Sequence, residues 1–333
     1  MKRSIKLLSL ILALIMSASL LTGCFGRRKG EPPVSTSDKR VIMTLGGYNV
    51  TYDFYRYLFL NTKDYLSDGD KDFWTKEGND VEMVKKYIID SLNDTYAMFT
   101  LADKYKITLS DEDKTYIDNM IEQSKGTMTD EEFKKSLEAS YMTPELYRFI
   151  LEVQQLEILV YNHIIAEDSG IIFADDKTVK KAVSEDFVRA THIFFLIEYE
   201  QEKTEKKELA EQLLQRLNNG EDFEALKEEY SEDTGLKGNT VGYYFLRGVY
   251  DKAFEDAAFS LKEGEISEVV TSYVGYHIIK RLPIEDKYVE DNLEDLRSQY
   301  LTSKYYAIIE ETYKDFEASY KKDYSDIKLD SFN

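Results

Sequence analysis

Two short apolar stretches decide the fold: RATHIFFLI at residues 189–197 and GYHIIKRL at residues 275–282. Both are rich in β-branched and aromatic residues, so we predict strands over Ala190–Ile197 and Tyr276–Leu282, the second after a tight turn at Gly275. Between them the periodicity predicts helices over Glu205–Asn218, Asp222–Tyr230 and Asp251–Ser260, and strands over Val241–Leu246 and Ile266–Ser272. Residues 185–284 are therefore expected to form a mixed domain of helices and strands.

The chain on both sides of this domain has the periodicity of helices. In Val81–Tyr105, for example, Val84, Ile88 and Leu92 recur at a spacing of four residues. Further helices are predicted over Tyr52–Leu66, from Ser110 onward, and over Asp130–Tyr141, Pro144–Ile165 and Asp291–Tyr320, after a small hairpin over Val41–Thr51. We therefore expect an α+β fold. Residues 41–184 and 285–333 form an all-helical lobe, with the C-terminal segment packed on the N-terminal one, and residues 185–284 are inserted between them.

Composition excludes several classes of function. The chain has 333 residues with 63 acidic and 43 basic side chains, a formal net charge of −20. A surface this acidic argues against nucleic acid as a partner, because phosphate binding needs clustered lysine and arginine. One cysteine excludes an intramolecular disulfide and a multi-cysteine metal site, and three histidines leave little room for a histidine-rich metal centre. We therefore expect no metal site, and no nucleophile-elbow, Walker or metalloprotease motif is present.

The N-terminus has the pattern of an export signal. Three basic residues precede an apolar run of fifteen residues, Leu7–Leu21, which is short for a membrane-spanning helix of about 20 residues. Leu21-Thr22-Gly23-Cys24 resembles the lipobox of bacterial lipoproteins, which implies a signal peptide over residues 1–23 and a lipidated Cys24. An ordinary signal peptide with an incidental cysteine and an uncleaved anchor are the alternatives. Residues 24–40, with Pro32-Pro33, have the composition of a tether.

The central domain resembles the parvulin-type peptidyl-prolyl isomerases over residues 185–284. The resemblance is carried, in order and with matching spacing, by Arg189-Ala190-Thr191-His192-Ile193, Gly220-x-Asp222-Phe223-x-x-Leu226, Tyr230-Ser231-Glu232-Asp233, Phe254-Glu255-x-Ala257-Ala258-Phe259 and Gly275-Tyr276-His277-Ile278-Ile279. It implies a four-stranded antiparallel sheet flanked by helices. With the lipobox and the helical flanks, the whole chain resembles the PrsA-like foldase lipoproteins and, in plan, the SurA-type periplasmic chaperones.

The resemblance also implies a set of site residues. Carried over by motif, His192, His277 and Asp233 are the catalytic residues of a hydrogen-bonded network, beneath a proline pocket walled by Val241, Tyr250 and Phe254. The reaction requires no cofactor, since rotation about the X–Pro bond faces only the resonance barrier of about 20 kcal/mol. Two alternatives stay open: the histidines and Phe254 are structural, and Asp233 is a loop acid or a helix cap.

The sequence departs from the family pattern at two places. Tyr250 stands where the family commonly has methionine, and residues 238–242 replace its usual glycine-rich turn. We expect a lipid-anchored foldase on the extracytoplasmic face of the cell membrane of a Gram-positive bacterium, whose partners are unfolded exported proteins and the lipid bilayer. The alternative is a non-catalytic chaperone with a degenerate parvulin domain. A solute-binding lipoprotein is disfavoured because the helical flanks lack repeated strand–helix units.

Overall fold

The computed structural model describes residues 40–332 except residues 68–69, 71, 77 and 198. The chain forms two compact units, which are described separately: residues 170–304, named here the sheet domain, and residues 40–169 with 305–332, named the helical lobe. The sheet domain thus contains residues 185–284 together with flanking segments on both sides. The expected signal peptide over residues 1–23, the lipidation site Cys24 and the tether up to residue 39 lie outside the described residues.

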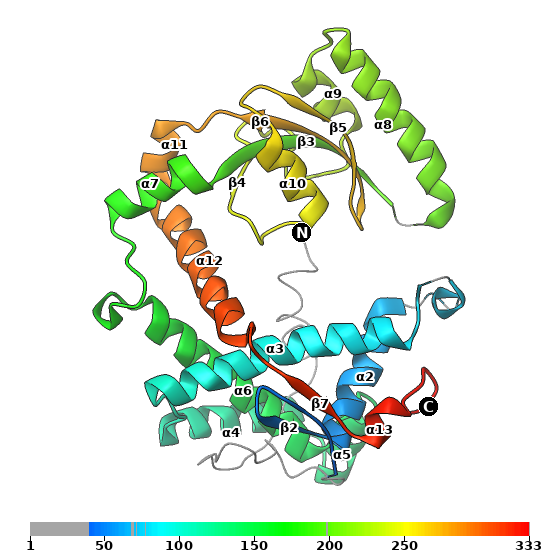
Figure 1. The fold of residues 1–333 in the computed structure, drawn as a ribbon, viewed down its shortest axis with the longest axis vertical. Helices are drawn as coiled ribbons and strands as arrows, with labels where there is room; N and C mark the ends of the chain where they lie inside the picture. Colours follow the sequence, from blue (N-terminus) through cyan, green and yellow to red (C-terminus); the bar gives the residue numbers. More distant parts are fainter. Residues whose placement is uncertain (1–39, 68–69, 71, 77, 198, 333) are drawn as a thin grey trace. The chain divides into compact units, whose positions relative to one another are not determined.

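The sheet domain is built on four antiparallel strands: β3 (Val188–Leu196), β4 (Tyr243–Phe245), β5 (Ile266–Thr271) and β6 (Gly275–Leu282). Their spatial order is β4-β3-β6-β5, so the two histidine-bearing strands are neighbours in the centre of the sheet (Figure 1). In the register of this pair, His192 lies opposite Ile279 and Phe194 lies opposite His277. The predicted fold class, a four-stranded antiparallel sheet flanked by helices, is confirmed.

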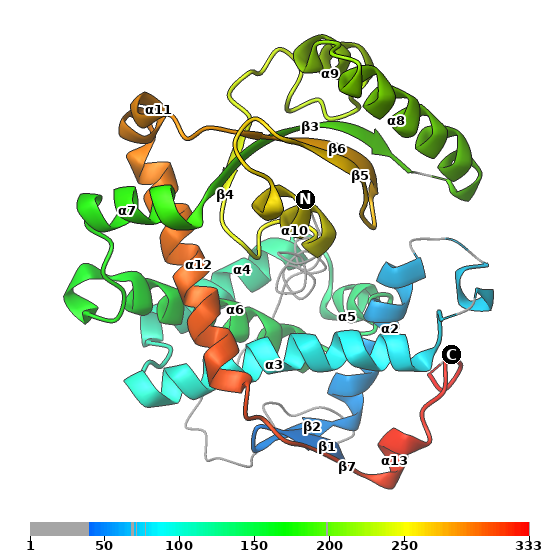
Figure 2. The ribbon, with the colours of Figure 1, turned by 45° about the horizontal axis from the view of Figure 1, so that its top comes forward.

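The two faces of this sheet carry different side chains. Helices α8 (Lys203–Asn218) and α9 (Phe223–Tyr230) cover one face and α10 (Lys252–Ser260) covers the other (Figure 2). Because side chains alternate along a strand, Ile193 and Phe195 enter an apolar core with α8 and α9. His192 has the opposite orientation and contacts Phe254 of α10. The histidines therefore lie on the α10 face, while the face under α8 and α9 is a mainly apolar core that also buries Lys227 and Thr191.

The helical lobe consists mainly of α2 (Tyr52–Ser67), α3 (Val81–Tyr105), α4 (Asp111–Lys125), α5 (Asp130–Glu138), α6 (Pro144–Ile165) and the part of α12 (Leu293–Tyr313) from Tyr305 onward. Capping boxes at Ser110 and Thr129 begin α4 and α5, and Thr143 caps α6 directly before Pro144. Helix α3 packs on α2 and α6. No described helix combines the length and the apolar character that crossing a membrane requires.

A small sheet in the helical lobe corrects part of the prediction. The expected hairpin is present as β1 (Val41–Leu45) and β2 (Tyr48–Thr51), but the predicted helix over Asp291–Tyr320 is wrong at its C-terminal end. Helix α12 ends at Tyr313, and residues Ala318–Tyr320 form β7, which pairs with β1. The edge of β1 supplies hydrogen-bond partners that helical periodicity cannot reveal. The sheet domain also contains the short helices α7 (Asp176–Asp186) and α11 (Asp286–Asp291), and the helical lobe contains α13 (Lys322–Ser325).

Candidate active site

A chain of hydrogen bonds joins the three side chains that the sequence singled out. His192 Nδ1 lies 3.0 Å from His277 Nδ1, and His192 Nε2 lies 2.7 Å from Asp233 Oδ2. Ser272 Oγ lies 2.7 Å from His277 Nε2, and the Tyr243 hydroxyl donates to Asp233 Oδ2 at 3.0 Å. Both histidines are buried, with 7% and 5% of their surface exposed. The structure thus brings His192, His277 and Asp233 into one continuous network.

The contacts define the proton positions when both rings are neutral. His192 Nε2–H then donates to Asp233, so His192 Nδ1 accepts from His277 Nδ1–H, and His277 Nε2 accepts from the Ser272 hydroxyl. Burial, followed by the proximity of His192, holds the pKa of His277 well below its usual value, which keeps this ring neutral. Each hydrogen bond of this network is therefore donated in the direction of Asp233.

Asp233 is the charged end of the network. Burial acts against its charged form, but the hydrogen bonds from His192, the Gly235 backbone N–H and the Tyr243 hydroxyl outweigh it and lower the pKa of this carboxyl below its usual value. Burial and the adjacent Asp233 carboxylate raise the pKa of Tyr243, so its hydroxyl remains a donor. The carboxylate is therefore ionised at neutral pH and fully hydrogen-bonded.

Aromatic rings enclose the two imidazoles. Phe254 contacts both histidine rings edge-on, with centroid distances of 5.3 Å to each, and Phe194 stacks on His277 at 4.7 Å. Tyr250 lies 5.4 Å from Phe254 and 6.0 Å from Tyr243. Tyr250 and Phe254 are thus adjacent, and the network faces an aromatic surface in which Phe254 itself is only 4% exposed.

Two buried charged side chains hold the segments around this surface. Arg189, 4% exposed, donates to the carbonyl oxygens of Val241 and Pro283 and pairs with Glu285. Val241 is therefore positioned through its backbone.

Glu255 anchors the loop that precedes α10. Its carboxylate, on a residue 5% exposed, accepts the backbone N–H groups of Gly248, Val249 and Tyr250. Three such bonds fix the backbone at Tyr250 and hence the place of its ring beside Phe254.

Sequence reasoning missed three members of the site. Phe194 could have been found, because it lies two residues after His192 and so shares its face of the strand. Ser272 and Tyr243 could not, because only the folding of a turn and of the edge strand β4 places their hydroxyls at His277 and Asp233.

Known proteins are similar to this chain both within the sheet domain and over nearly its whole length. A family described as the PPIC-type PPIASE domain matches residues 176–285. The foldase protein PrsA of Caldanaerobacter subterraneus subsp. tengcongensis is 31% identical over 320 residues, which cover 92% of each chain. The chain belongs to the PrsA foldase family.

Other PrsA proteins are similar over shorter lengths. The foldase protein PrsA of Staphylococcus aureus (strain MRSA252) is 31% identical over 244 residues, 69% of this chain and 71% of the relative. The crystal structure of the Bacillus anthracis PrsA peptidylprolyl isomerase is 25% identical and covers 67% of this chain and 95% of its own, with a TM-score of 0.35. The family assignment therefore rests on the sequence alignments. This PrsA-family chain is a protein-folding factor, and its PPIC-type domain is a parvulin-type peptidyl-prolyl cis-trans isomerase.

Proposed function

We propose that His192, His277 and Asp233 form the catalytic network of the isomerase and that Phe254, Tyr250 and Val241 hold the proline ring of the substrate. The observation that carries the proposal is the continuous chain from Ser272 through both imidazoles to Asp233, directly beneath Phe254. If the two histidines were only structural, nothing would require their chain of hydrogen bonds to end on an ionised carboxylate that faces an aromatic surface.

The chemistry needs orientation more than proton transfer. Rotation about the X–Pro bond removes amide conjugation and separates neither charge nor a leaving group, so no proton moves in the net reaction. A site accelerates it by binding the twisted amide more tightly than either planar isomer. The aromatic surface holds the ring, and the network beneath it presents polar atoms in fixed positions, which minimises reorganisation during the rotation.

Asp233→Asn tests the catalytic role with little change in size. We expect kcat/KM for an Ala-Pro peptide to fall by about tenfold or more, since the amide removes the charge on which His192 is oriented. Asp256→Asn is the matched control, because this exposed carboxylate of α10 pairs with Arg247 and Lys252 outside the network. Full activity of Asp233→Asn would refute the role, and it would favour the alternative of a scaffold with a degenerate site.

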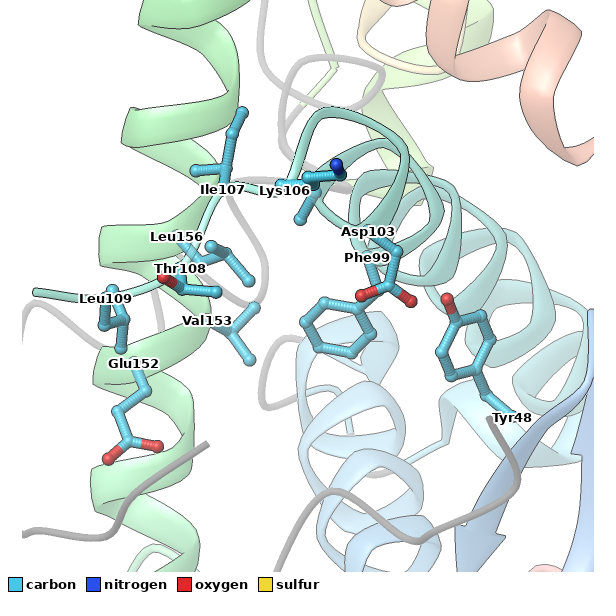
Figure 3. A pocket seen from close by; sticks show the side chains of 11 residues that line it. Tyr48, Phe99, Asp103, Lys106, Ile107, Thr108, Leu109, Glu152, Val153 and Leu156 are labelled. Atoms are coloured by element: carbon cyan, nitrogen blue, oxygen red, sulfur yellow. The ribbon is translucent and has the colours of Figure 1, made fainter. Parts of the chain in front are cut away.

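We further propose that the helical lobe holds unfolded clients. A cavity of about 350 Å³ supports this, with walls contributed by α3, the segment after it and α6. The side chains of Phe99, Val153 and Leu156 point into it (Figure 3). A mainly apolar cavity of this volume can take one large apolar side chain of a client segment.

Leu156→Ser tests the holding role. We expect weaker suppression of aggregation of an unfolded client, with helical content retained. Tyr116→Ser is the control, because Tyr116 is 55% exposed on α4 and does not line the cavity. Equal suppression by both variants would contradict a role for the cavity.

Anchoring through a lipidated Cys24 on the extracytoplasmic face of the membrane completes the proposal. It rests on the lipobox at residues 21–24. Cys24→Ser should move the protein out of the membrane fraction or block its processing, because it removes the residue that would carry the lipid. Stable anchoring needs two or more acyl chains. Failure of labelled fatty acid to enter the wild-type protein would exclude lipidation.

A further inference from the structure

The helical lobe contains acidic side chains on three packed helices. On α3, Asp90 and Asp94 are four residues apart and share one face. On α6, which packs against α3, Glu157 shares a face with Tyr161 in the same way. The Tyr161 ring contacts Tyr305 of α12 edge-on, with a centroid distance of 5.0 Å. Asp94 also lies close enough to Glu157 and to Glu310 of α12 to interact electrostatically with both, so the three faces converge on one place, named here the acidic tyrosine cluster.

Helix α12 adds tyrosines and one more acid to this cluster. Tyr306, Glu310 and Tyr313 lie three and four residues apart and so share a face of the helix. The Tyr305 ring packs against Tyr306 at 5.5 Å. Burial, then the charge of Glu157, raises the pKa of Tyr306 to about 12, so the hydroxyl stays protonated. The cluster thus combines carboxylates with several phenol rings.

The carboxylates of the cluster act on one another, with one lysine beside them. Asp90 and Glu310 are the charged groups that act on Asp94, and Asp94 acts on Glu157. Lys86 partly offsets the charge of Asp90. Burial, followed by these like charges, raises the pKa of Asp94 and of Glu157 to about 7 in each case. Two partly desolvated acids thus repel each other across the α3–α6 interface.

A buried hydroxyl at the same place points to a missing ligand. Tyr305 is 2% exposed, and its hydroxyl has no hydrogen-bond partner among the described residues. Glu157 and Asp94 are the carboxylates that act on this hydroxyl. Buried polar groups of native proteins are nearly always hydrogen-bonded, so a donor supplied from outside would complete the site. The described residues contain no group of three or more ligands suited to a metal ion, which favours an organic cation.

We propose that the acidic tyrosine cluster binds the ammonium or guanidinium groups of lysine and arginine side chains in unfolded clients. Carboxylates neutralise such groups, phenol rings attract them through their faces, and a guanidinium N–H can donate to the Tyr305 hydroxyl. This inference rests on the proposed holding of clients by the helical lobe and names the side chains that the lobe selects. It also gives the tyrosines of α12 a role other than packing.

Binding of paired peptides tests the inference on the full chain. The probes are a glycine-serine peptide with three arginines and the same peptide with citrulline, which has the same shape without the charge. We expect the wild type to prefer the arginine peptide by about tenfold or more. The Asp94→Asn/Glu157→Gln variant should lose most of that preference.

The control removes the same net charge elsewhere on the lobe. Glu112→Gln/Glu138→Gln changes two exposed acids of α4 and α5, and it should keep the wild-type preference. If both double variants lose the preference equally, or both keep it, the attraction is general to an acidic surface and the inference is overturned. Absence of arginine-peptide binding overturns it as well, as does tight binding of calcium without any preference for arginine.

Proton release gives a readout that a structural role would not move. A bound cation favours the ionised forms of Asp94 and Glu157, so binding near pH 7 should release protons in calorimetry with two buffers of different ionisation enthalpy. The Asp94→Asn/Glu157→Gln variant should release none. Equal release by this variant would contradict the assignment.

Suppression of client aggregation distinguishes failure of the cation site from failure of the proposed holding of clients. If the wild type and Asp94→Asn/Glu157→Gln suppress aggregation of a basic client equally, holding stands and the cation site falls. If the arginine peptide binds at the cluster but no client is held, the site stands and the proposed holding falls.

Discussion

Buried carboxylates are compensated by hydrogen bonds in the sheet domain and are left beside other acids in the helical lobe. In the sheet domain, Asp233 receives hydrogen bonds from His192, Tyr243 and the Gly235 backbone, so the buried carboxylate is compensated. In the lobe, Asp94 and Glu157 face other acids, and the hydroxyl of Tyr305 has no hydrogen-bond partner within the part of the chain that the structure describes. The comparison teaches that a site for a neutral rearrangement can be complete before its substrate arrives. A site for a charged ligand is left uncompensated until the ligand binds.

The largest effect is expected from a glycine that holds the sheet together. Gly275 opens β6 with a φ of +153°, and a Cβ added there would lie 1.9 Å from the carbonyl oxygen of Phe195. Gly275→Ala should therefore destabilise the sheet domain by more than about 4 kcal/mol, while the lobe keeps its own unfolding transition. Calorimetry should show loss of one transition only.

Gly264→Ala is the matched control for this change. Gly264 also has a positive φ, +83°, but a Cβ there would meet nothing within 4 Å. We expect a loss of about 1 kcal/mol, from backbone strain alone. Equal effects of the two variants would show that the contact with Phe195 does not decide the outcome.

Acidification should change the stability of the two regions in opposite directions, lowering it in the sheet domain and raising it in the helical lobe. The pKa of His277 is lowered by folding, so its contribution to stability is present above about pH 6.5 and is lost as the pH falls. The pKa values of Asp94 and Glu157 are raised to about 7, so their contribution is present at low pH and is lost as the pH rises from about 4 to 7.

Hydrogen exchange at pH 5.5 and 7.5 measures both effects in one sample. Protection factors of β3 and β6 should fall at pH 5.5, while those of α3 and α6 should rise. Parallel changes in both regions would contradict the contrast between compensated and uncompensated charge.

Removing one acid of the repelling pair should stabilise the lobe. Asp94→Asn keeps the shape and abolishes the repulsion with Glu157, so the lobe transition at pH 8 should rise by several degrees, at about 2–4 °C for each 1 kcal/mol. The gain should vanish at pH 5, where the wild-type pair is protonated. A decrease at pH 8 would show that Asp94 has a stabilising partner.

The smallest effect is expected when the substrate residue before proline is varied. In the segment after β3, Lys206 is paired with Glu232 and Glu202, and Lys207 with Glu211, so these ammonium groups are already compensated. We expect no preference for phosphoserine-Pro over Ala-Pro or Lys-Pro peptides, because a phosphate needs arginine forks or several free lysines. The catalytic efficiencies on matched peptides at two salt concentrations are the measurement. A clear preference for the phosphopeptide at both would overturn this expectation.

Most of the sheet domain could be predicted from the sequence because its signals are local. Branched and aromatic residues in 189–197 and 275–282 predict the central strands, and the resemblance to the parvulins implies that His192, His277 and Asp233 share one network. The sequence could not show strand β7, because it exists only through pairing with β1. The acidic tyrosine cluster was hidden for the same reason, since Asp94, Glu157 and Tyr305 meet only when three distant helices pack.

Isomerisation by the His192→Ala/His277→Ala variant decides whether the buried histidine network is the active site. The measurement is kcat/KM for cis/trans isomerisation of an Ala-Pro peptide by the full chain, with the thermal unfolding of the sheet domain followed in parallel. We expect activity to fall by more than about tenfold and the sheet domain to lose roughly 1–3 kcal/mol of stability, because the buried network around Asp233 is broken. A double variant with full activity and full stability would contradict the claim that this network forms the active site.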